Sequence, residues 1–454
     1  VEELVMRTNA TYTLNKFTDA FSSIENTEQS KEFIHVLKNF VLPHLCIGLR
    51  KTEEVVQTEY ISVLEYLVAN LKNYDDLDDM KVLLFGNDEE ANFFKNINHI
   101  QLHRRQRAII RLRDYRSSLS ENSIAHYILP IIEHYAFPSD EKLRNIANET
   151  VETISMLVRC INWKQYRALF RRYVANLKKS KPELLRENVS LIVSISDSLL
   201  QSSKDTRNES TDRIKGIPTG SEELNMFILL EVVPPLSKIL GVRNDETITS
   251  RVRLSEALTN YVSVLPEDQV ETQLAGILTS TCQVMRSRSE ELRDAVRKSL
   301  ARMAITLGAT YFKFIIQELK TALSRGSQIH VLSFTVHSLI VAMLPHLNAG
   351  DLDDSVLIVV NIIMEDIFGA AGQEKDADGY TSKMKEVKHN KSYDTGELLS
   401  SNISLSSFTA LVSPIKMLLQ ENVSLKIQNK LDELIRRYSL GLNHNEKSSS
   451  KEIL

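Results

Sequence analysis

Glycine and proline are scarce in this chain of 454 residues, which has 14 glycines and 10 prolines. Average usage would give about 30 and about 20. Because these two residues build most tight turns, their scarcity predicts a mainly helical chain. It also disfavours sheet-rich folds and enzymes that depend on glycine-rich loops.

Cysteine is equally rare. Cys46, Cys160 and Cys282 lie more than a hundred residues apart, and no CxxC or Cys-His spacing occurs. This pattern predicts neither a zinc site nor a disulfide framework, and it favours reduced, intracellular thiols. The chain begins Val-Glu-Glu without Met and shows no basic-then-apolar leader, so we expect a piece of a longer protein.

Catalytic motifs are missing too. The sequence contains no GxxxxGK[ST], GxGxxG, HExxH or GxSxG segment. His99 and His103 share a helix face, but Arg104 and Arg105 follow them, and clustered positive charge opposes a metal ion. We therefore expect no metal, no cofactor, no small-molecule substrate and no enzymatic activity.

No segment has the clear sequence pattern of a membrane-spanning helix. The uncharged run 327–350 is long enough, but it contains three histidines, several serines and Pro345, which are costly in lipid. We interpret it as a buried helix of a helical array, and we expect no membrane partner.

A helical repeat runs through the chain. From a starting residue, apolar side chains recur at steps of +3, +7, +10 and +14, which is one face of a four-turn helix. The frame starts at Gln57, Arg105, Arg144, Arg186, Arg251, Arg293, Ser333 and Ser424. These starts are 48, 39, 42, 65, 42, 40 and 91 residues apart. Most spacings match the period of about 40–47 residues of HEAT-type helical hairpins.

The spacing predicts an all-α, ARM-like α-solenoid of HEAT-like hairpins that continues over residues 1–454. Polar insertions are expected at about 73–91, 202–223 and 369–397, with a loop or tail at 441–454. Prolines inside apolar runs predict kinked first helices of hairpins. These prolines are Pro43, Pro130, Pro234 and Pro345.

Arginine recurs at the first position of the frame in Arg144, Arg186, Arg251 and Arg293. These side chains either line a phosphate-contacting surface or form a structural ladder. In a ladder, each would bond a neighbouring repeat's carboxylate or carbonyls. We favour the ladder.

The formal net charge of -4 excludes a protein that coats nucleic acid with a uniformly basic surface. Two basic stretches nevertheless stand out. The first contains Arg104, Arg105, Arg107, Arg111, Arg113 and Arg116. The second contains Lys164, Arg167, Arg171, Arg172, Lys178, Lys179 and Lys181, interleaved with four aromatic residues. We expect the aromatic residues in the core. The cations suit contact with nucleic acid or with an acidic protein, and the sequence leaves both open.

Two segments resemble a known family. NFFKNINHIQLHRRQRA (residues 92–108) and KHNKSYDTGELLSSNIS (residues 388–404) are similar to segments of the DRIM family, very long nucleolar HEAT-repeat proteins of the small-subunit processome. The resemblance spans most of the chain and implies an internal fragment. From the family's first motif, we transfer only the cations as candidates for contact with RNA or a partner protein: His103, Arg104, Arg105 and Arg107.

The resemblance implies a non-catalytic scaffold in ribosome biogenesis. Such proteins act in the nucleolus with the U-three snoRNP, in processing toward 18S rRNA. Pre-ribosomal RNA and processome proteins would be the partners. The alternatives are a HEAT-repeat nuclear transport receptor, for which the charge is insufficiently acidic, and the helical scaffold region of a large kinase.

Overall fold

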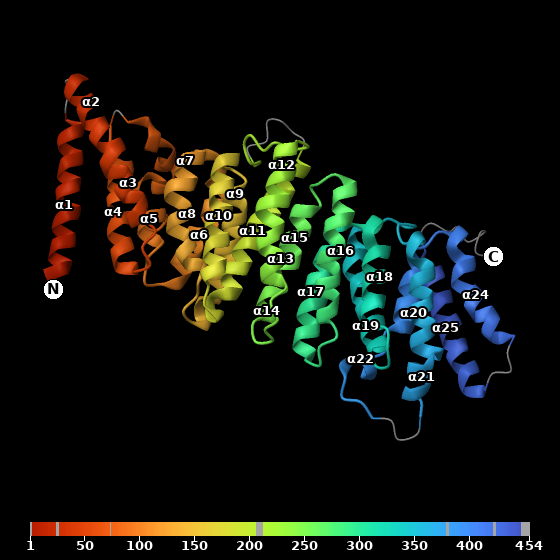
Figure 1. Ribbon diagram of the computed structural model, residues 1–454. Coiled ribbons are helices and arrows are strands. Elements are labelled where there is room, and N and C mark those ends of the chain that lie inside the picture. The colour runs from red at the N-terminus through yellow and green to blue at the C-terminus, as the bar shows by residue number, and fades with distance from the viewer. Residues whose placement is uncertain are drawn as a thin grey trace. The chain divides into compact units, whose positions relative to one another are not determined.

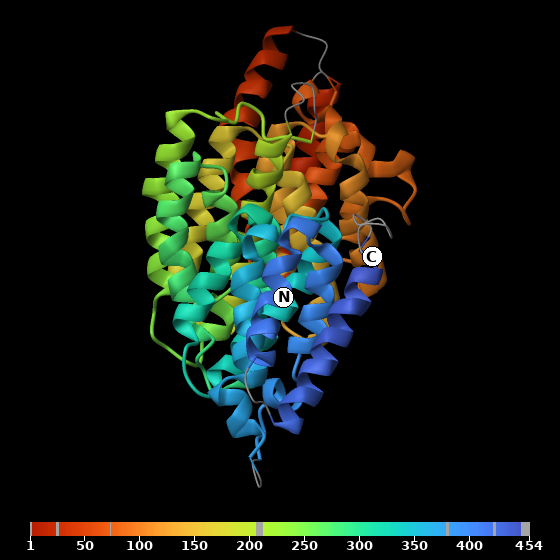
Figure 2. The same cartoon turned by 90° about the vertical axis from the view of Figure 1, so that its right-hand side faces the viewer.

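The computed structural model describes residues 2–23, 27–72, 74–205, 212–377, 381–420 and 424–445. It divides into two compact units, Val1–Asn225 and Met226–Leu454. Within each unit, long helices lie side by side and alternate in direction (Figures 1 and 2). The described residues contain no β-strand, only an isolated bridge between Asn162 and Lys215. The chain is therefore all-α, as predicted.

The α-helices of the first unit are α1 (Glu2–Ser22), α2 (Thr27–Val36), α3 (Leu42–Gly48), α4 (Glu54–Asn70), α5 (Phe93–Asn96), α6 (Leu102–Tyr115), α7 (Glu121–Ser123), α8 (Leu129–Glu133), α9 (Arg144–Val158), α10 (Trp163–Lys179) and α11 (Leu185–Lys204). α12 (Glu222–Met226) lies at the division between the units. Helices α6, α9 and α11 pack in sequence against one another, and α10 pairs with α11 as a hairpin.

The α-helices of the second unit are α13 (Val233–Leu240), α14 (Ile248–Arg251), α15 (Leu254–Val262), α16 (Glu267–Val284), α17 (Glu290–Leu307), α18 (Phe312–Ala322), α19 (Gln328–Met343), α20 (Val356–Phe368), α21 (Ala370–Lys375), α22 (Lys385–Lys388), α23 (Ser392–Asn402), α24 (Phe408–Leu419) and α25 (Leu425–Asn443). Two layers form here. One contains α15, α17, α19, α23 and α25, and the other contains α16, α18, α20 and α24.

All starts of the predicted frame except Arg251 fall on the second helix of a hairpin or at its cap, and Arg251 ends the short helix α14 just before α15. Arg144 opens α9, Arg293 lies in α17, and Ser424 caps α25 through its side chain. Most residues at the apolar steps are buried, as Ala147, Ile154 and Val158 show for α9, where Val151 is half-buried. The repeat prediction is therefore confirmed, because the buried stripe of each second helix is what the frame detects.

Proline alters the hydrogen bonding of three helices, each the first helix of its hairpin. A π-helical segment precedes the proline in each: η1 (Leu37–Val41), η4 (Ile124–Ile128) and η8 (Phe227–Val232) lie just before Pro43, Pro130 and Pro234. Proline lacks an N–H and its ring crowds the carbonyl four residues earlier, so wider hydrogen bonding relieves the helix there. The expectation for Pro345 is wrong. This proline lies in a 3-10 turn, η10 (Leu344–His346), that ends α19.

The three expected insertions contain ordered structure. The first forms η2 (Asp75–Asn87), whose Leu77, Met80 and Leu83 are buried. In the second, Lys215 exchanges backbone hydrogen bonds with Ile161 and Trp163.

The third expected insertion includes α21, α22 and the start of α23. In the expected tail, α25 continues to Asn443. Residues 206–211, 378–380 and 446–454 of these expected stretches lie outside the described residues.

By length and composition alone, two helical stretches, Gln328–His346 and Asp353–Lys375, are apolar and long enough to cross a membrane. The first corresponds to the run interpreted above as a buried helix. It packs against α17, α18, α20 and α23, and buried His330 contacts buried Asp366 of the second stretch. Their apolar character is thus used in packing between helices.

Candidate nucleic-acid interface

The first basic stretch lies on α6, whose Ala108, Ile109 and Leu112 face the core. Its first two arginines are held by the preceding segment. Arg104 pairs with Glu90 at 3.1 Å. Arg105 pairs with Glu54 at 2.6 Å and donates to the carbonyl of His99 at 2.5 Å. These arginines clamp the chain that leads into α6.

The later arginines of α6 are bound as well. Arg111 donates to the carbonyl of Ala91, and its guanidinium lies over the Phe85 ring, 5.5 Å from the centroid. Arg113 reaches α9, where it contacts Glu149, Glu152 and Thr153. This contact joins two successive second helices.

Arg116, just after α6, bonds Asp212 through two nitrogens at 3.1 and 3.2 Å. The pKa of Arg116 is raised because of the hydrogen bond with Asp212. Among His103 and the six arginines of this stretch, the described contacts leave only His103 and Arg107 exposed and without a side-chain partner. The other five side chains are held by contacts within the fold.

The second stretch lies on α10 and begins with a capping box. The Asn162 side chain accepts from the Gln165 N–H, and the Gln165 side chain accepts from the Asn162 N–H. Such reciprocal bonds fix a helix start.

The aromatic residues of α10 are core residues. Trp163, Tyr166, Phe170 and Tyr173 are exposed by 8%, 0%, 1% and 3%. The Tyr166 hydroxyl donates to the carbonyl of Ile195 in α11 at 2.8 Å. None of these four rings is available for stacking on a nucleic-acid base.

Two arginines on the flanks of α10 bind carboxylates of neighbouring elements. Arg172 makes two hydrogen bonds to Glu133, both at 2.6 Å, and Tyr173 donates to the same carboxylate at 2.8 Å. Burial alone would lower the pKa of Arg172, but Glu133 outweighs it and the pKa is raised. Arg167 pairs with Glu223 at 3.4 Å.

The remaining cations lie on the outer side of this hairpin. Lys164, Arg171, Lys178, Lys179 and Lys181 are all exposed. Within the described residues, the side chains of the four lysines make no hydrogen bond and no ion pair. The structure thus separates α10 into an inner arginine set that is bound and an outer set that faces solvent.

The four frame arginines differ among themselves. Buried Arg251 donates to the carbonyls of Ile239, Leu240, Val242 and Asn244, which lie in its own hairpin. Buried Arg293 binds both carboxylate oxygens of Glu386, at 2.8 and 2.9 Å. Arg144 pairs with Glu141, one turn away, and Arg186 is exposed. Among the residues that the structure describes, neither Arg144 nor Arg186 makes a side-chain contact to a neighbouring repeat.

Sequence reasoning missed two buried polar networks in the second unit. In the first, Glu386 of α22 binds Arg293 and also Arg297, the latter at 2.6 Å. Burial alone would raise the pKa of Glu386, but the arginine hydrogen bonds outweigh it and lower the pKa to about 2. This network ties the segment after α21 to α17.

In the second network, Asp366 accepts from Asn390 and Ser392 and contacts His330 at 2.6 Å. Asn390 and Ser392 belong to the second family motif, and this motif was the sequence signal that could have revealed the network.

The first family motif also forms internal hydrogen bonds. Asn92 caps α5 and donates to Glu65, while Asn96 donates to the carbonyls of Glu89 and Asn92. Both motifs therefore encode internal hydrogen bonding.

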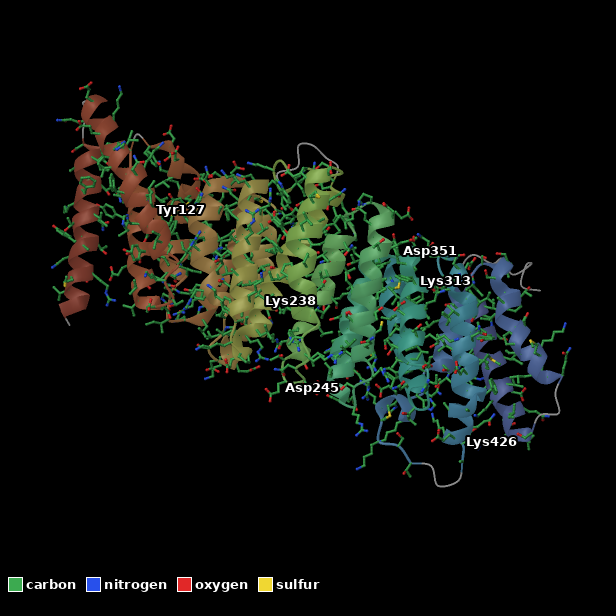
Figure 3. All side chains as sticks on the ribbon, in the orientation of Figure 1. Tyr127, Lys238, Asp245, Lys313, Asp351 and Lys426 are labelled. Carbon is green, nitrogen blue, oxygen red and sulfur yellow. The ribbon has the colours of Figure 1, made fainter. Side chains whose placement is uncertain are left out.

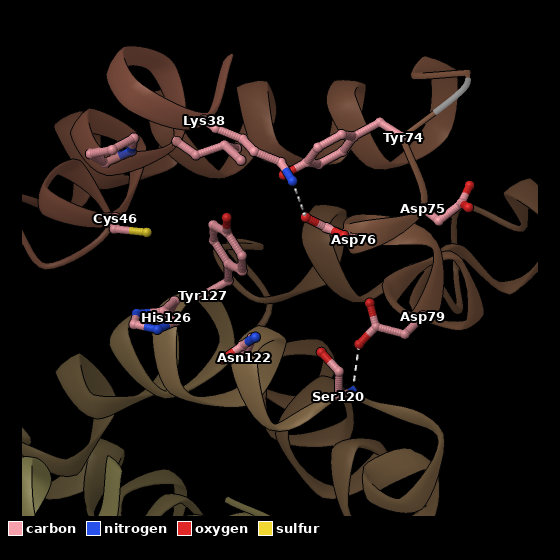
Figure 4. A pocket seen from close by; sticks show the side chains of 12 residues that line it. Lys38, Cys46, Tyr74, Asp75, Asp76, Asp79, Ser120, Asn122, His126 and Tyr127 are labelled. Atoms are coloured by element: carbon pink, nitrogen blue, oxygen red, sulfur yellow. Dashed lines mark hydrogen bonds and ion pairs between the residues drawn. The ribbon is translucent and has the colours of Figure 1, made fainter. Parts of the chain in front are cut away.

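A cavity of about 720 Å³ lies beside α3 in the first unit (Figure 4). Two π-helical segments line it, through Lys38 of η1 and His126 and Tyr127 of η4. Lys38 pairs with Asp76 at 3.1 Å. Asp79 accepts from the Ser120 N–H at 2.5 Å.

Burial raises the pKa of the Cys46 thiol in the same cavity, which disfavours a reactive thiolate. The described residues hold no group of three or more His, Cys, Asp or Glu side chains that would bind a metal ion.

Comparison with known proteins gives consistent family matches. The model described as "U3 small nucleolar RNA-associated protein 20 domain" matches residues 242–454. The model described as "U3 small nucleolar RNA-associated protein 20, N-terminal" matches residues 1–53. Together they cover more than half of the chain.

Two curated relatives carry the name U3 small nucleolar RNA-associated protein 20. The chain is 51% identical over 455 residues to the one from Saccharomyces cerevisiae and 34% identical over 469 residues to the one from Schizosaccharomyces pombe. Each match covers 100% of this chain but only 18% and 19% of the relatives. The chain thus spans about a fifth of their length.

Similarity to solved structures is weak. Importin beta matches with a TM-score of 0.35 and 12% identity, over 88% of this chain and 52% of that chain. A designed armadillo repeat protein matches with a TM-score of 0.24 and 13% identity, over 58% of this chain and 99% of that chain. These superpositions add no argument to the helices described above. The sequence matches do: the chain belongs to the U3 small nucleolar RNA-associated protein 20 family, which confirms the resemblance seen in its motifs.

Proposed function

We propose that this chain is one segment of a non-catalytic scaffold in the assembly of the small ribosomal subunit. The whole protein would act in the small-subunit processome, in the nucleolus, and support processing toward 18S rRNA. The observation that carries the proposal is the match over the whole chain to relatives named for association with U3 small nucleolar RNA.

The architecture supports a scaffold. Stacked hairpins share a continuous core within each unit and leave long helix faces to solvent, which suits the binding of extended partners. Burial raises the pKa of all three thiols, that of Cys160 to about 11, so none is poised as a nucleophile. The His330–Asp366–Ser392 cluster is also buried, at 2%, 2% and 0% exposure, which denies it a substrate.

The two rival functions have less support. A nuclear transport receptor and a kinase scaffold share the helical-repeat architecture. Neither accounts for a match over the whole chain to proteins named for a small nucleolar RNA.

The test uses the full-length protein, tagged in its own cells. We expect it to localise to the nucleolus and to co-purify with U3 small nucleolar RNA and precursors of 18S rRNA. Its depletion should reduce mature 18S rRNA and spare the large-subunit rRNAs. Purification of the intact protein without these RNAs would refute the proposal.

A further inference from the structure

The outer side of the α10–α11 hairpin carries lysines whose side chains make no described contact within the fold. Lys164 and Lys178 are 14 residues apart on α10, so they lie on one face and span about 21 Å at 1.5 Å per residue. Exposed Arg171 lies midway on this face, and Lys179 and Lys181 continue it into the turn before α11. We call Lys164, Arg171, Lys178, Lys179 and Lys181 the outer α10 face.

Three acids near α10 are bound by cations outside this face. Glu133 binds Arg172, Glu223 pairs with Arg167, and Asp212 pairs with Arg116 and Arg159. No Asp or Glu occurs from Arg159 to Lys181, and the nearest in sequence after it is Glu183. The outer α10 face therefore retains an excess of positive charge although the whole chain is slightly negative.

Helix stability does not explain this placement. Lysines at the C-terminal end of a helix interact favourably with its dipole, which accounts for Lys178 and Lys179. Lys164 lies in the first turn, where the dipole opposes a cation, and Lys181 lies beyond the helix. The fold gives no reason for these two lysines, so a partner is the better explanation.

The face fits RNA rather than protein. Protein interfaces depend on large apolar or aromatic anchors and are depleted in lysine. Between the cations this face exposes Ala168, Ala175 and Asn176, while the aromatic residues of α10 are buried. Contact with a phosphate backbone needs only cations and small side chains that allow close approach.

We infer that the outer α10 face binds the phosphate backbone of RNA, without base stacking or sequence recognition. The inference deepens the proposed function and rests on it, because the RNA would be pre-ribosomal. It also assigns different tasks to the two basic stretches: α6 clamps the fold, and α10 contacts the ligand.

The test variant is the triple substitution Lys178→Gln, Lys179→Gln and Lys181→Gln in the full-length protein. The matched control is Lys238→Gln, Lys298→Gln and Lys313→Gln, which removes the same charge from exposed lysines that have no described partner (Lys238 and Lys313 are labelled in Figure 3). All six side chains are exposed, so both variants should fold.

The readout is ultraviolet crosslinking in cells with mapping of the crosslinked peptides, followed by filter binding of purified protein to single-stranded RNA at several salt concentrations. We expect crosslinks within residues 164–186, and their loss in the test variant only. Three lost phosphate contacts should reduce the slope of log K against log salt by about 2 and weaken binding about 10- to 100-fold near 0.15 M salt.

Three outcomes would contradict the inference. Crosslinks in the unaltered protein that avoid residues 164–186, while U3 RNA still co-purifies, would overturn it and leave the proposed function intact. Crosslinking of these lysines to an acidic protein would replace RNA by that protein. Equal losses of crosslinking and of RNA affinity in both variants would show a general charge effect. Absence of U3 RNA from the purified protein would instead refute the proposed function.

Discussion

Glu386 shows how much of this fold depends on single charged residues. Its carboxylate is fully buried and binds two arginines of α17. Buried ion pairs are costly to break, because the remaining charges keep their desolvation penalty without compensation. The short helix α22 is therefore attached by buried charge as well as by the buried side chain of Val387.

Substitution Glu386→Gln should release α22 from α17. Removal of one partner of a buried pair typically costs about 3–5 kcal/mol. We expect faster amide hydrogen exchange in α22 and at the start of α17, measured on the full-length protein. Lys298→Gln on the exposed side of α17 is the control. Unchanged protection in Glu386→Gln would show that the cluster contributes no net stability.

Acid should have the same effect as that substitution. The pKa of Glu386 is lowered from an ordinary value of 4.5 to about 2. The stabilisation is therefore complete above pH 4.5 and is lost as the pH falls toward 2, and the shift corresponds to about 3 kcal/mol. Hydrogen exchange between pH 5 and pH 2.5 should show α22 losing protection before α15. Simultaneous loss of protection would contradict this.

At the scale of elements, helices α23 and α25 approach closely because glycine faces each contact. A Cβ at Gly441 would overlap the carbonyl oxygen of Glu397 and the Ser400 hydroxyl. A Cβ at Gly396 would lie 2.5 Å from Cε1 of Tyr438. Small residues thus set the distance between these two helices.

Gly441→Ala should destabilise this helix pair by about 1–3 kcal/mol, since overpacking forces backbone shifts. Gly276→Ala in α16 is the matched control, because nothing lies within 4 Å of its new Cβ. Alanine there should stabilise α16 by up to about 1 kcal/mol through helix propensity. Native-state hydrogen exchange in α23 and α25 measures the first effect, and exchange in α16 measures the second. Equal effects at the two glycines would contradict the packing account.

These packing details explain what the sequence could predict. The apolar frame detected helices such as α9 and α17, whose buried stripes are aliphatic. It missed α23, because the buried face of that helix consists largely of Ser392, Thr395, Gly396 and Ser400. A search for hydrophobic periodicity has no signal for a face made of small and polar residues.

The sequence also could not assign the arginines. Glu386 is 93 residues from Arg293, and Asp212 is 96 residues from Arg116. Composition and spacing give no access to partners at such distances. For the same reason, the free lysines of α10 could not be told from its bound arginines before the packing was known.

If the first basic stretch clamps the fold, its arginines should matter for stability and not for RNA binding. Arg116→Gln removes two hydrogen bonds to Asp212 and should destabilise the contact by about 1–3 kcal/mol. We expect faster hydrogen exchange around the end of α6 and unchanged RNA crosslinking. Lost crosslinking with unchanged exchange would give α6 the role inferred here for α10.

At the scale of the whole molecule, the chain spans about a fifth of its curated relatives and forms two compact units. That they continue as a single solenoid over residues 1–454 stays a prediction. A long scaffold divides its tasks among segments, and here the outer α10 face offers four lysines whose side chains make no described ion pair. The account therefore predicts a local rather than a distributed RNA contact.

One measurement tests this division of tasks directly: the ratio of RNA crosslinks in residues 164–186 to those in residues 103–116, mapped on the unaltered full-length protein in cells. The account predicts that crosslinks concentrate in the first segment, because its lysines are free while most arginines of the second are bound within the fold. Crosslinks concentrated at 103–116 instead would contradict it.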